Sequence, residues 1–260
     1  MMKAKDIMHP DDAKALQILK KVKGLDGVVR LFMENGYEQL FRGENLGCML
    51  KVNAHNFPSV WKIFRAVVRK VGIREPELYI YNDPIMNAYT YGETHTFIAL
   101  SSSLVERLNP EELKSIIAHE CDHILCKHTL YQTLLDTIED LGFLAGILTY
   151  SVAGPLYLAM QYWSRKSELS ADRCAAAIVG ERTFQSAMLK LTCGIAATGG
   201  DPYQLVRQAQ EYHRMENSSW WNRIQQNCRI ALYTHPQMCE RAWEIDRWKE
   251  SWQYRRLRQS

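Results

Sequence analysis

This sequence lacks several features that would place it in other protein classes. Segment 1–23 is broken by Asp6, Asp11 and Asp12 and has no apolar stretch, so it does not predict a secretory signal peptide. The seven cysteines are scattered and form no Cys-x-x-Cys pair, which favours free thiols in a reducing cytoplasm over a disulfide framework. The net charge of +3 and the lack of a dense basic stripe argue against a nucleic-acid partner. We therefore expect a cytoplasmic protein.

The composition is that of a folded globular protein. The chain has 260 residues, of which 47% are hydrophobic and 23% charged, enough to bury a sizeable core and too mixed for a disordered chain. We expect a main domain over residues 46–260, preceded by a helical extension of unknown role over residues 1–45.

Hydrophobic spacing predicts a mainly helical α+β protein with a small sheet. Val60, Phe64 and Val67 recur at helical intervals within 59–71, and Gly72 is placed to cap that helix. The other expected elements are strands over 77–81 and 94–100 and helices over 11–23, 129–163, 164–180, 183–198, 202–216, 221–230 and 236–250.

The most informative motif is the pentapeptide His-Glu-Cys-Asp-His over residues 119–123. Asn109 is a good N-cap, so a helix begins upstream and runs through the motif. Two histidines four residues apart on a helix point the same way, with the glutamate between them. Zincins hold a catalytic zinc ion and its general base in this manner. We expect His119 and His123 to be zinc ligands and Glu120 to be the base.

A third ligand is expected downstream, because a catalytic zinc takes three protein ligands and a water. Glu168 and Asp172 lie one helical turn apart, where a bare like-charge pair mildly destabilises a helix. A cation and a histidine partner would remove that penalty, although such pairs are common on helices. We expect Glu168 to bind the metal and Asp172 to accept the free ring N–H of a ligand histidine. Small residues at Ala171 and 175–177 would let this helix approach the zinc helix closely.

The expected chemistry is hydrolysis of a peptide bond. Zinc would lower the pKa of a bound water towards about 7, and Glu120 would take its proton and pass it to the leaving amine. His235 is the candidate oxyanion donor, although taken alone it is more ordinarily a turn residue. Strand 94–100 would be a sheet edge beside the zinc cleft, to which an extended substrate adds as a strand. The substrate-binding residues on it would be Thr96, Phe97 and Ile98.

Taken together, these motifs resemble those of the zinc metallopeptidases that include HtpX and the CAAX prenyl proteases, a gluzincin family. The similarity covers residues 46 to 242. The matching residues are Pro58, 76–80, Asn87-Ala88-Tyr89, Leu104, 111–113, 118–120, Glu168, Ala171-Asp172, Thr234-His235-Pro236 and Arg241. The resemblance implies a zincin-like catalytic domain with one Zn²⁺ per chain, Glu168 as third ligand and His235 at the active site. It also implies that Asn87 and Ala88 lie near the substrate and that Arg241 has a structural part around the site.

The sequence departs from that family at two places. Asp122 stands where the family usually has glycine, and by helical angle it points away from the ligand face. The family's N-terminal transmembrane helices have no counterpart in residues 1–45. His128 also lies off the ligand face, and we expect it to be structural.

Residues 141–163 contain no charged side chain and are long enough to span a bilayer. A single span would separate His123 from Glu168, which must bind one zinc, and Pro155 interrupts the run. We therefore favour a bent, buried helix or a helical hairpin. Peripheral membrane contact through this segment or through the C-terminal tail, which carries Trp252, is the alternative.

The sequence thus favours a zinc-dependent endopeptidase that acts on extended or unfolded polypeptide. The alternative is a zinc-stabilised peptide-binding or membrane-surface adaptor with little turnover. Glu120 favours the enzyme, because a pure binder needs no base beside the metal.

Overall fold

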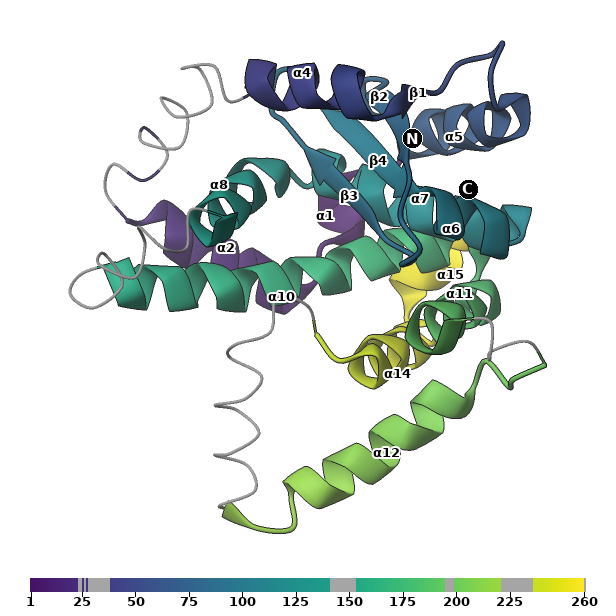
Figure 1. The fold of residues 1–260 in the computed structure, drawn as a ribbon. Helices are drawn as coiled ribbons and strands as arrows, with labels where there is room; N and C mark the ends of the chain where they lie inside the picture. Colours follow the sequence, from purple (N-terminus) through teal and green to yellow (C-terminus); the bar gives the residue numbers. More distant parts are fainter. Residues whose placement is uncertain are drawn as a thin grey trace.

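The computed structural model describes residues 1–22, 25, 27, 38–140, 153–194, 199–220 and 236–259, and shows a small sheet surrounded by helices (Figure 1). The prediction of a mainly helical α+β fold is confirmed. The strands are β1 (Leu50–Lys51), β2 (Glu77–Tyr81), β3 (Ala88–Tyr91) and β4 (Phe97–Ser101). The helices are α1 (Ala4–Ile7), α2 (Pro10–Lys20), α4 (Glu38–Cys48), α5 (Pro58–Val71), α6 (Ser102–Arg107), α7 (Pro110–Leu125), α8 (Thr129–Asp140), α10 (Ala153–Val179), α11 (Glu181–Cys193), α12 (Gln204–Glu216), α14 (Met238–Trp248) and α15 (Trp252–Gln259).

The sheet has the strand order β1-β2-β4-β3, with β2 and β4 parallel and the other pairs antiparallel. Strand β4 pairs on both sides, and all five of its residues are buried. The prediction of a sheet edge over 94–100 is therefore wrong: the strand begins at Phe97 and is interior, and the edge next to it is β3. A strand covered on both faces needs apolar side chains throughout, which explains the run Phe-Ile-Ala-Leu over 97–100.

Helix α5 forms as its apolar spacing predicts. It begins at Pro58 and ends at Val71, and Gly72 adopts a φ of 86°, a left-handed conformation that favours glycine after a helix. Val60 and Phe64 are buried in the core that α5 shares with α7 and the sheet. This packing fixes α7 beneath the strands.

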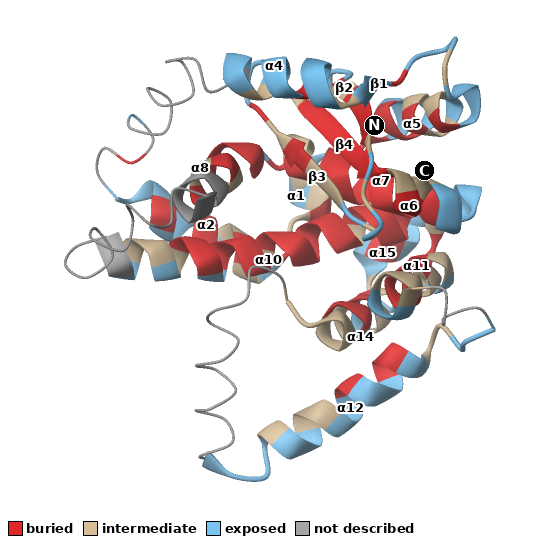
Figure 2. Cartoon of the chain, viewed as in Figure 1, coloured by how far each residue is buried: buried red, intermediate tan, exposed pale blue. Residues whose placement is uncertain are grey.

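Helix α7 packs most extensively against α10. Asn109 and Glu112 form a reciprocal capping box at its start, and Pro110 takes the first helical position. Ala171 and the alanines at 175–177 on α10 are completely buried, so small side chains allow the two helices to approach closely, as expected. Figure 2 shows α7 and most of α10 as buried.

The helices after α7 differ in part from the predicted ranges. Helix α10 runs unbroken through the boundary expected between 163 and 164, and Pro155 lies in its first turn, where a missing N–H is tolerated. Residues 141–152 and the predicted helix over 221–230 lie outside the described residues. None of the described helices is long and apolar enough to cross a membrane.

The two ends of the described chain pack onto the same body. Ile7 lies in the main core, while Leu16 and Leu19 of α2 pack with Trp163 of α10. At the other end α15 buries Leu257 in the main core. Segment 1–20 therefore shares its packing with the main domain.

The capping residue Glu112 gives a test of this core. Burial alone would raise its pKa, but Lys190, the Asn109 N–H and the Ser186 hydroxyl hold that pKa below its ordinary value. Glu112→Gln should lower the free energy of unfolding by about 1–2 kcal/mol near pH 7. Because the folded pKa is the lower one, this stabilisation is present above about pH 4.3 and is lost as pH falls through the folded pKa. Urea unfolding near neutral pH and at about pH 3 measures it.

Glu111→Gln is the matched control, because Glu111 is exposed and pairs only with Lys114 among the described ion pairs. It should change the free energy of unfolding by less than about 0.5 kcal/mol. An equal loss in Glu112→Gln at both pH values would refute the assignment to the charged carboxylate.

Candidate metal centre

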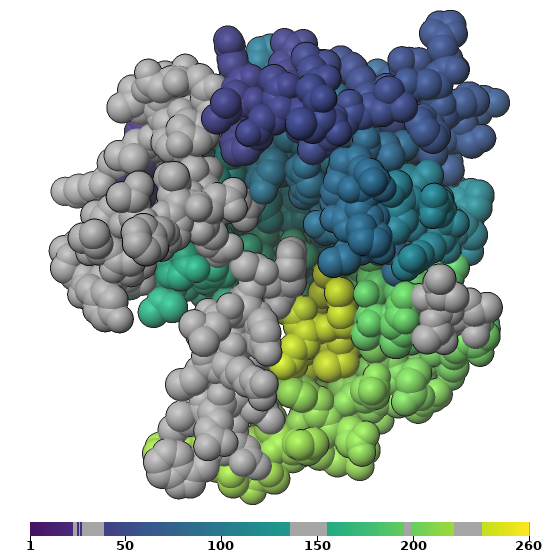
Figure 3. All heavy atoms as spheres, in the orientation of Figure 1, coloured from purple at the N-terminus to yellow at the C-terminus, as the bar shows by residue number. Residues whose placement is uncertain are grey.

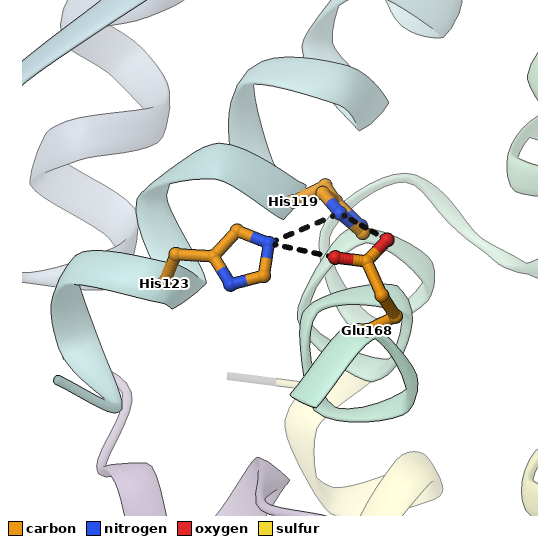
Figure 4. Close-up of side chains that lie close together, drawn as sticks. All are labelled: His119, His123 and Glu168. Carbon is orange, nitrogen blue, oxygen red and sulfur yellow. Dashed lines mark hydrogen bonds and ion pairs between the residues drawn. The ribbon is translucent and has the colours of Figure 1, made fainter. Parts of the chain in front are cut away.

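Three side chains from two helices converge in the interior. His119 and His123 project from α7 and Glu168 projects from α10, and all three are buried (Figure 4). The two histidine Nε2 atoms are 3.3 Å apart. Oxygens of Glu168 lie 3.5 Å from Nε2 of His119 and 3.3 Å from Nε2 of His123. The motif on one helix and the acid on the other therefore present three donor atoms to one point.

These separations fit a tetrahedral metal ion. Metal–ligand bonds of about 2.0–2.1 Å in a tetrahedron place neighbouring ligand atoms roughly 3.3–3.4 Å apart. The separations of 3.3, 3.3 and 3.5 Å are close to that figure, with Oε2 of Glu168 facing His119 and Oε1 facing His123. Two neutral nitrogens and one carboxylate form a donor set suited to zinc. The residues present therefore fit the ion in ligand type and spacing.

The donor set also attracts positive charge. Burial alone would lower the pKa of His119, but the carboxylates of Glu168 and Asp172 raise it to about 10. When only the protein's own groups are considered, a proton on the His119 imidazole therefore balances part of the buried negative charge. A divalent cation would balance it instead, with release of that proton.

Asp172 and Arg241 surround the donor set from behind. Asp172 Oδ1 lies 3.0 Å from Nδ1 of His119, the contact expected of a residue that fixes the tautomer of a ligand. Arg241 of α14 donates to both oxygens of Asp172, at 2.8 and 2.6 Å, and its Nη1 lies 3.4 Å from Glu168. Although burial opposes this, the arginine holds the pKa of Asp172 below its ordinary value. The arginine thus favours the charged form of Asp172 and contacts both carboxylates.

Glu120 is positioned by the edge strand of the sheet. Its carboxylate accepts a hydrogen bond of 2.6 Å from the hydroxyl of Thr90 on β3, and both residues are buried. The same hydroxyl lies 3.4 Å from the Glu120 carbonyl oxygen. One oxygen of the expected base is thus held by strand β3.

A cavity of about 360 Å³ opens onto these groups. Its polar wall contains His119, Glu120, His123 and Glu168, and strand β3 forms another side. Its apolar lining comes from Met86, Leu104, Ile116, Leu135, Met188, Leu191 and Met238. Figure 3 shows this face recessed between the blue and teal sheet region and the yellow and green C-terminal helices. The expectation of an edge strand beside the cleft is met by β3.

The other predicted substrate residues fall into two groups. Asn87 and Ala88 line the cavity. Thr96, Phe97 and Ile98 do not: Thr96 precedes β4, while Phe97 and Ile98 are buried within this interior strand. The strand over 94–100 was wrongly expected at the sheet edge because an apolar run does not reveal whether a strand is central or at an edge. The predicted oxyanion donor His235 lies outside the described residues.

Asp122, which departs from the family pattern, is completely buried and does not line the cavity. Its Oδ1 accepts from the thiol of Cys126, and burial raises its pKa. It does not appear among the groups that face the donor set, as its helical angle predicted.

Sequence reasoning missed four residues of the centre. Thr90 carries no motif of its own. Gln132 reaches within 3.3 Å of His123 Nδ1, and His128 within 3.1 Å of the same atom. Asp12 lies 3.0 Å from the far side of the His128 ring. All of these contacts except that between His123 and His128 join different secondary-structure elements, so no local spacing signals them.

A buried set of two histidines and a glutamate, with a further glutamate facing the same cavity, is the arrangement of a metallopeptidase. Residues 54–249 match the model of peptidase family M48, and the chain belongs to that family. The resemblance to HtpX-type metallopeptidases is therefore confirmed.

Individual relatives agree with this assignment. Over 261 residues the chain is 27% identical to plastoglobule-localized metallopeptidase 48, chloroplastic, of Arabidopsis thaliana, in an alignment that covers 98% of this chain and 75% of the relative. It is 58% and 56% identical over 52 residues to HtpX protease homologues of Helicobacter acinonychis (strain Sheeba) and Helicobacter pylori (strain J99). Each of those matches covers 19% of this chain and 17% of the relative. No solved structure matches the chain.

The contact between Thr90 and Glu120 predicts a kinetic defect. Thr90→Val keeps the shape of the side chain but removes the hydrogen bond to the carboxylate, so kcat should fall by about tenfold. Zinc affinity should not change, because Thr90 touches none of the three donor groups. Peptidase assays and chelator competition would separate the two effects. Thr90→Ser, which keeps the hydroxyl, is the control, and a loss as large as that of valine would contradict the assignment.

Proposed function

We propose that this protein is a zinc-dependent endopeptidase that cleaves extended or unfolded polypeptide. The observation that carries the proposal is the position of Glu120. Its carboxylate faces the same cavity as His119, His123 and Glu168, and it is fixed there by Thr90. A structural metal site would have no use for an oriented carboxylate beside its donors.

The residues would divide the chemistry among them. His119, His123 and Glu168 would hold one zinc ion, which when bound activates a water and polarises the scissile carbonyl. Glu120 would take a proton from the attacking water and deliver it to the leaving amine. Asp172 and Arg241 would keep His119 and Glu168 aligned. His235 remains our candidate for the donor to the tetrahedral oxyanion.

The edge strand β3 would hold the substrate. Among the described strands it pairs only with β4, and an extended peptide would pair with its other edge. It also carries Ala88 and Thr90 along the cavity. A peptide bound there as an additional strand would lie across the donor set, and folded proteins cannot present such a segment. The methionines at 86, 188 and 238 would accept an apolar side chain of the substrate.

The alternative functions have weaker support. A peptide-binding adaptor would not need Glu120. A membrane-surface role would rest on segments such as the C-terminal helix, where Trp252 is 67% exposed with Arg256 over its ring, while Tyr254 and Leu257 are buried. One exposed tryptophan supports at most a peripheral contact, which liposome flotation without detergent would detect.

Cleavage of casein by the zinc-loaded protein tests the proposal. Glu120→Gln should keep zinc and lose activity by at least about a hundredfold, because the base is removed while the donors remain. Glu168→Ala should weaken zinc binding itself, because it leaves two protein ligands. Cleavage would be followed by gel electrophoresis, and bound zinc by metal analysis.

Glu111→Gln, on the exposed side of α7, is the control that should keep both properties. Zinc bound at one per chain with no cleavage of any unfolded substrate would favour the adaptor. Zinc held as tightly by Glu168→Ala as by the wild type would refute the third ligand.

A further inference from the structure

We propose that Asp12 and His128 form a relay that holds the ring of the metal ligand His123, so that the N-terminal helix α2 is a working part of the metal centre. This inference rests on the metal site proposed above. It concerns positioning residues, since neither side chain is among the three donor groups. The relay joins residues 116 positions apart in the chain.

His128 lies between His123 and Asp12. Its Nδ1 is 3.1 Å from Nδ1 of His123, and its Nε2 is 3.0 Å from Oδ2 of Asp12. His128 and Asp12 are completely buried, and His123 is nearly so. Water therefore does not compete for these contacts.

The order of these contacts fixes the tautomers. Asp12 as a carboxylate can only accept, so His128 must carry its proton on Nε2. In the neutral ring its Nδ1 is then an acceptor, and the relay gives the proton to the facing Nδ1 of His123. This leaves the lone pair of His123 on Nε2, the atom that faces Glu168 and His119. The carboxylate on α2 thus selects the form of His123 that can bind a metal.

The other ligand histidine is held in the same way by a shorter path. Nδ1 of His119 meets the carboxylate of Asp172 directly. Nδ1 of His123 meets a carboxylate only through His128. Gln132 also approaches that nitrogen at 3.3 Å, but its amide is shared with Ser167 and offers no charge. Each ligand histidine is therefore connected to a buried carboxylate. The carboxylate connected to His123, that of Asp12, lies outside residues 54–249, the region that matches the family model.

The surroundings of Asp12 stabilise the charged form of its carboxyl group. Oδ1 accepts from Trp163 Nε1 at 3.1 Å, and Oδ2 accepts from Ser170 Oγ at 2.5 Å as well as from His128. Burial would raise its pKa, yet these donors hold the pKa below its ordinary value. Helix α2 delivers the residue because its apolar side, with Ala15, Leu16 and Leu19, packs against the helices that carry Tyr131 and Trp163.

Asp12→Asn is the most discriminating test, because every group described in contact with the Asp12 carboxylate donates a hydrogen bond to it. An amide has one oxygen and one NH₂ group, so in either orientation the NH₂ would face a donor. If it faces His128, that ring takes the other tautomer and His123 must carry its proton on Nε2. Zinc binding should weaken by about tenfold to a hundredfold, measured by chelator competition. The visible spectrum of the cobalt-substituted protein should change as well.

Four further variants separate the relay from simple docking of α2. Trp163→Phe and Ser170→Ala each remove one contact of Asp12 without breaking the relay, so they should lower thermal stability but keep zinc affinity. Trp163→Phe added to Asp12→Asn removes the N–H that forces the amide to turn, so the double variant should bind zinc more tightly than Asp12→Asn. Asp11→Asn, the same change at the neighbouring position, should bind zinc as the wild type does.

The outcomes are distinct. A wild type that binds no zinc overturns the metal site and the relay together. A wild type that binds zinc, with Asp12→Asn within about twofold of it, overturns the relay alone. Equal losses of affinity in Asp12→Asn, Trp163→Phe and Ser170→Ala would also overturn it, because Asp12 would then serve only to dock α2.

The wild-type protein offers a test that no misfolded variant can obscure. Nitrogen-15 NMR of the wild-type protein, recorded before zinc is added, reads the histidine tautomers directly. The relay requires a proton on Nε2 of His128 and on Nδ1 of His123. A proton on Nδ1 of His128 would overturn it.

Discussion

The close packing of α7 against α10 is the contact on which the site depends. Buried small residues on α10, Ala171 among them, accompany this close packing, which places Glu168 within 3.5 Å of both histidines. A shift of about 1 Å between the two helices would break a tetrahedral donor set. The hydrophobic core and the metal centre are therefore not independent. The uncharged residues at the contact between α7 and α10 determine whether the metal-binding side chains come together.

This packing brings an unusual amount of negative charge into the interior. Glu120, Glu168, Asp172 and Asp12 are all buried within or behind the centre, and each such carboxylate is costly unless it is paired. Arg241 offsets part of the cost through its contacts with Asp172 and Glu168. A bound cation would offset more. The same buried charge that disfavours the isolated protein thus favours metal binding, and folding and loading are coupled.

The sequence predicted what depends on local spacing and missed what depends on long-range packing. The cap of α7 and the histidine pair lie within one helix, so their geometry follows from 3.6 residues per turn. Glu168 could be found because it shares a helical turn with Asp172. Strand β3 was missed because four residues of Ala-Tyr-Thr-Tyr give too short a pattern, and because the longer apolar run of β4 was taken for the edge. Asp12 was placed only within the expected helix over 11–23, since nothing near it in the sequence reveals a partner 116 residues away.

The relay explains why a family-matched region that begins at residue 54 is not the whole of the centre. A ligand histidine bound through one ring nitrogen remains free to rotate unless the other nitrogen is held. For His119 the hold comes from α10, the same helix that supplies Glu168. For Nδ1 of His123 the described contacts include no carboxylate of α10, and His128 extends the path to α2 instead. Each ligand is thus anchored by a different helix packed around α7. Displacing α2 would therefore free His123 while leaving His119 in place.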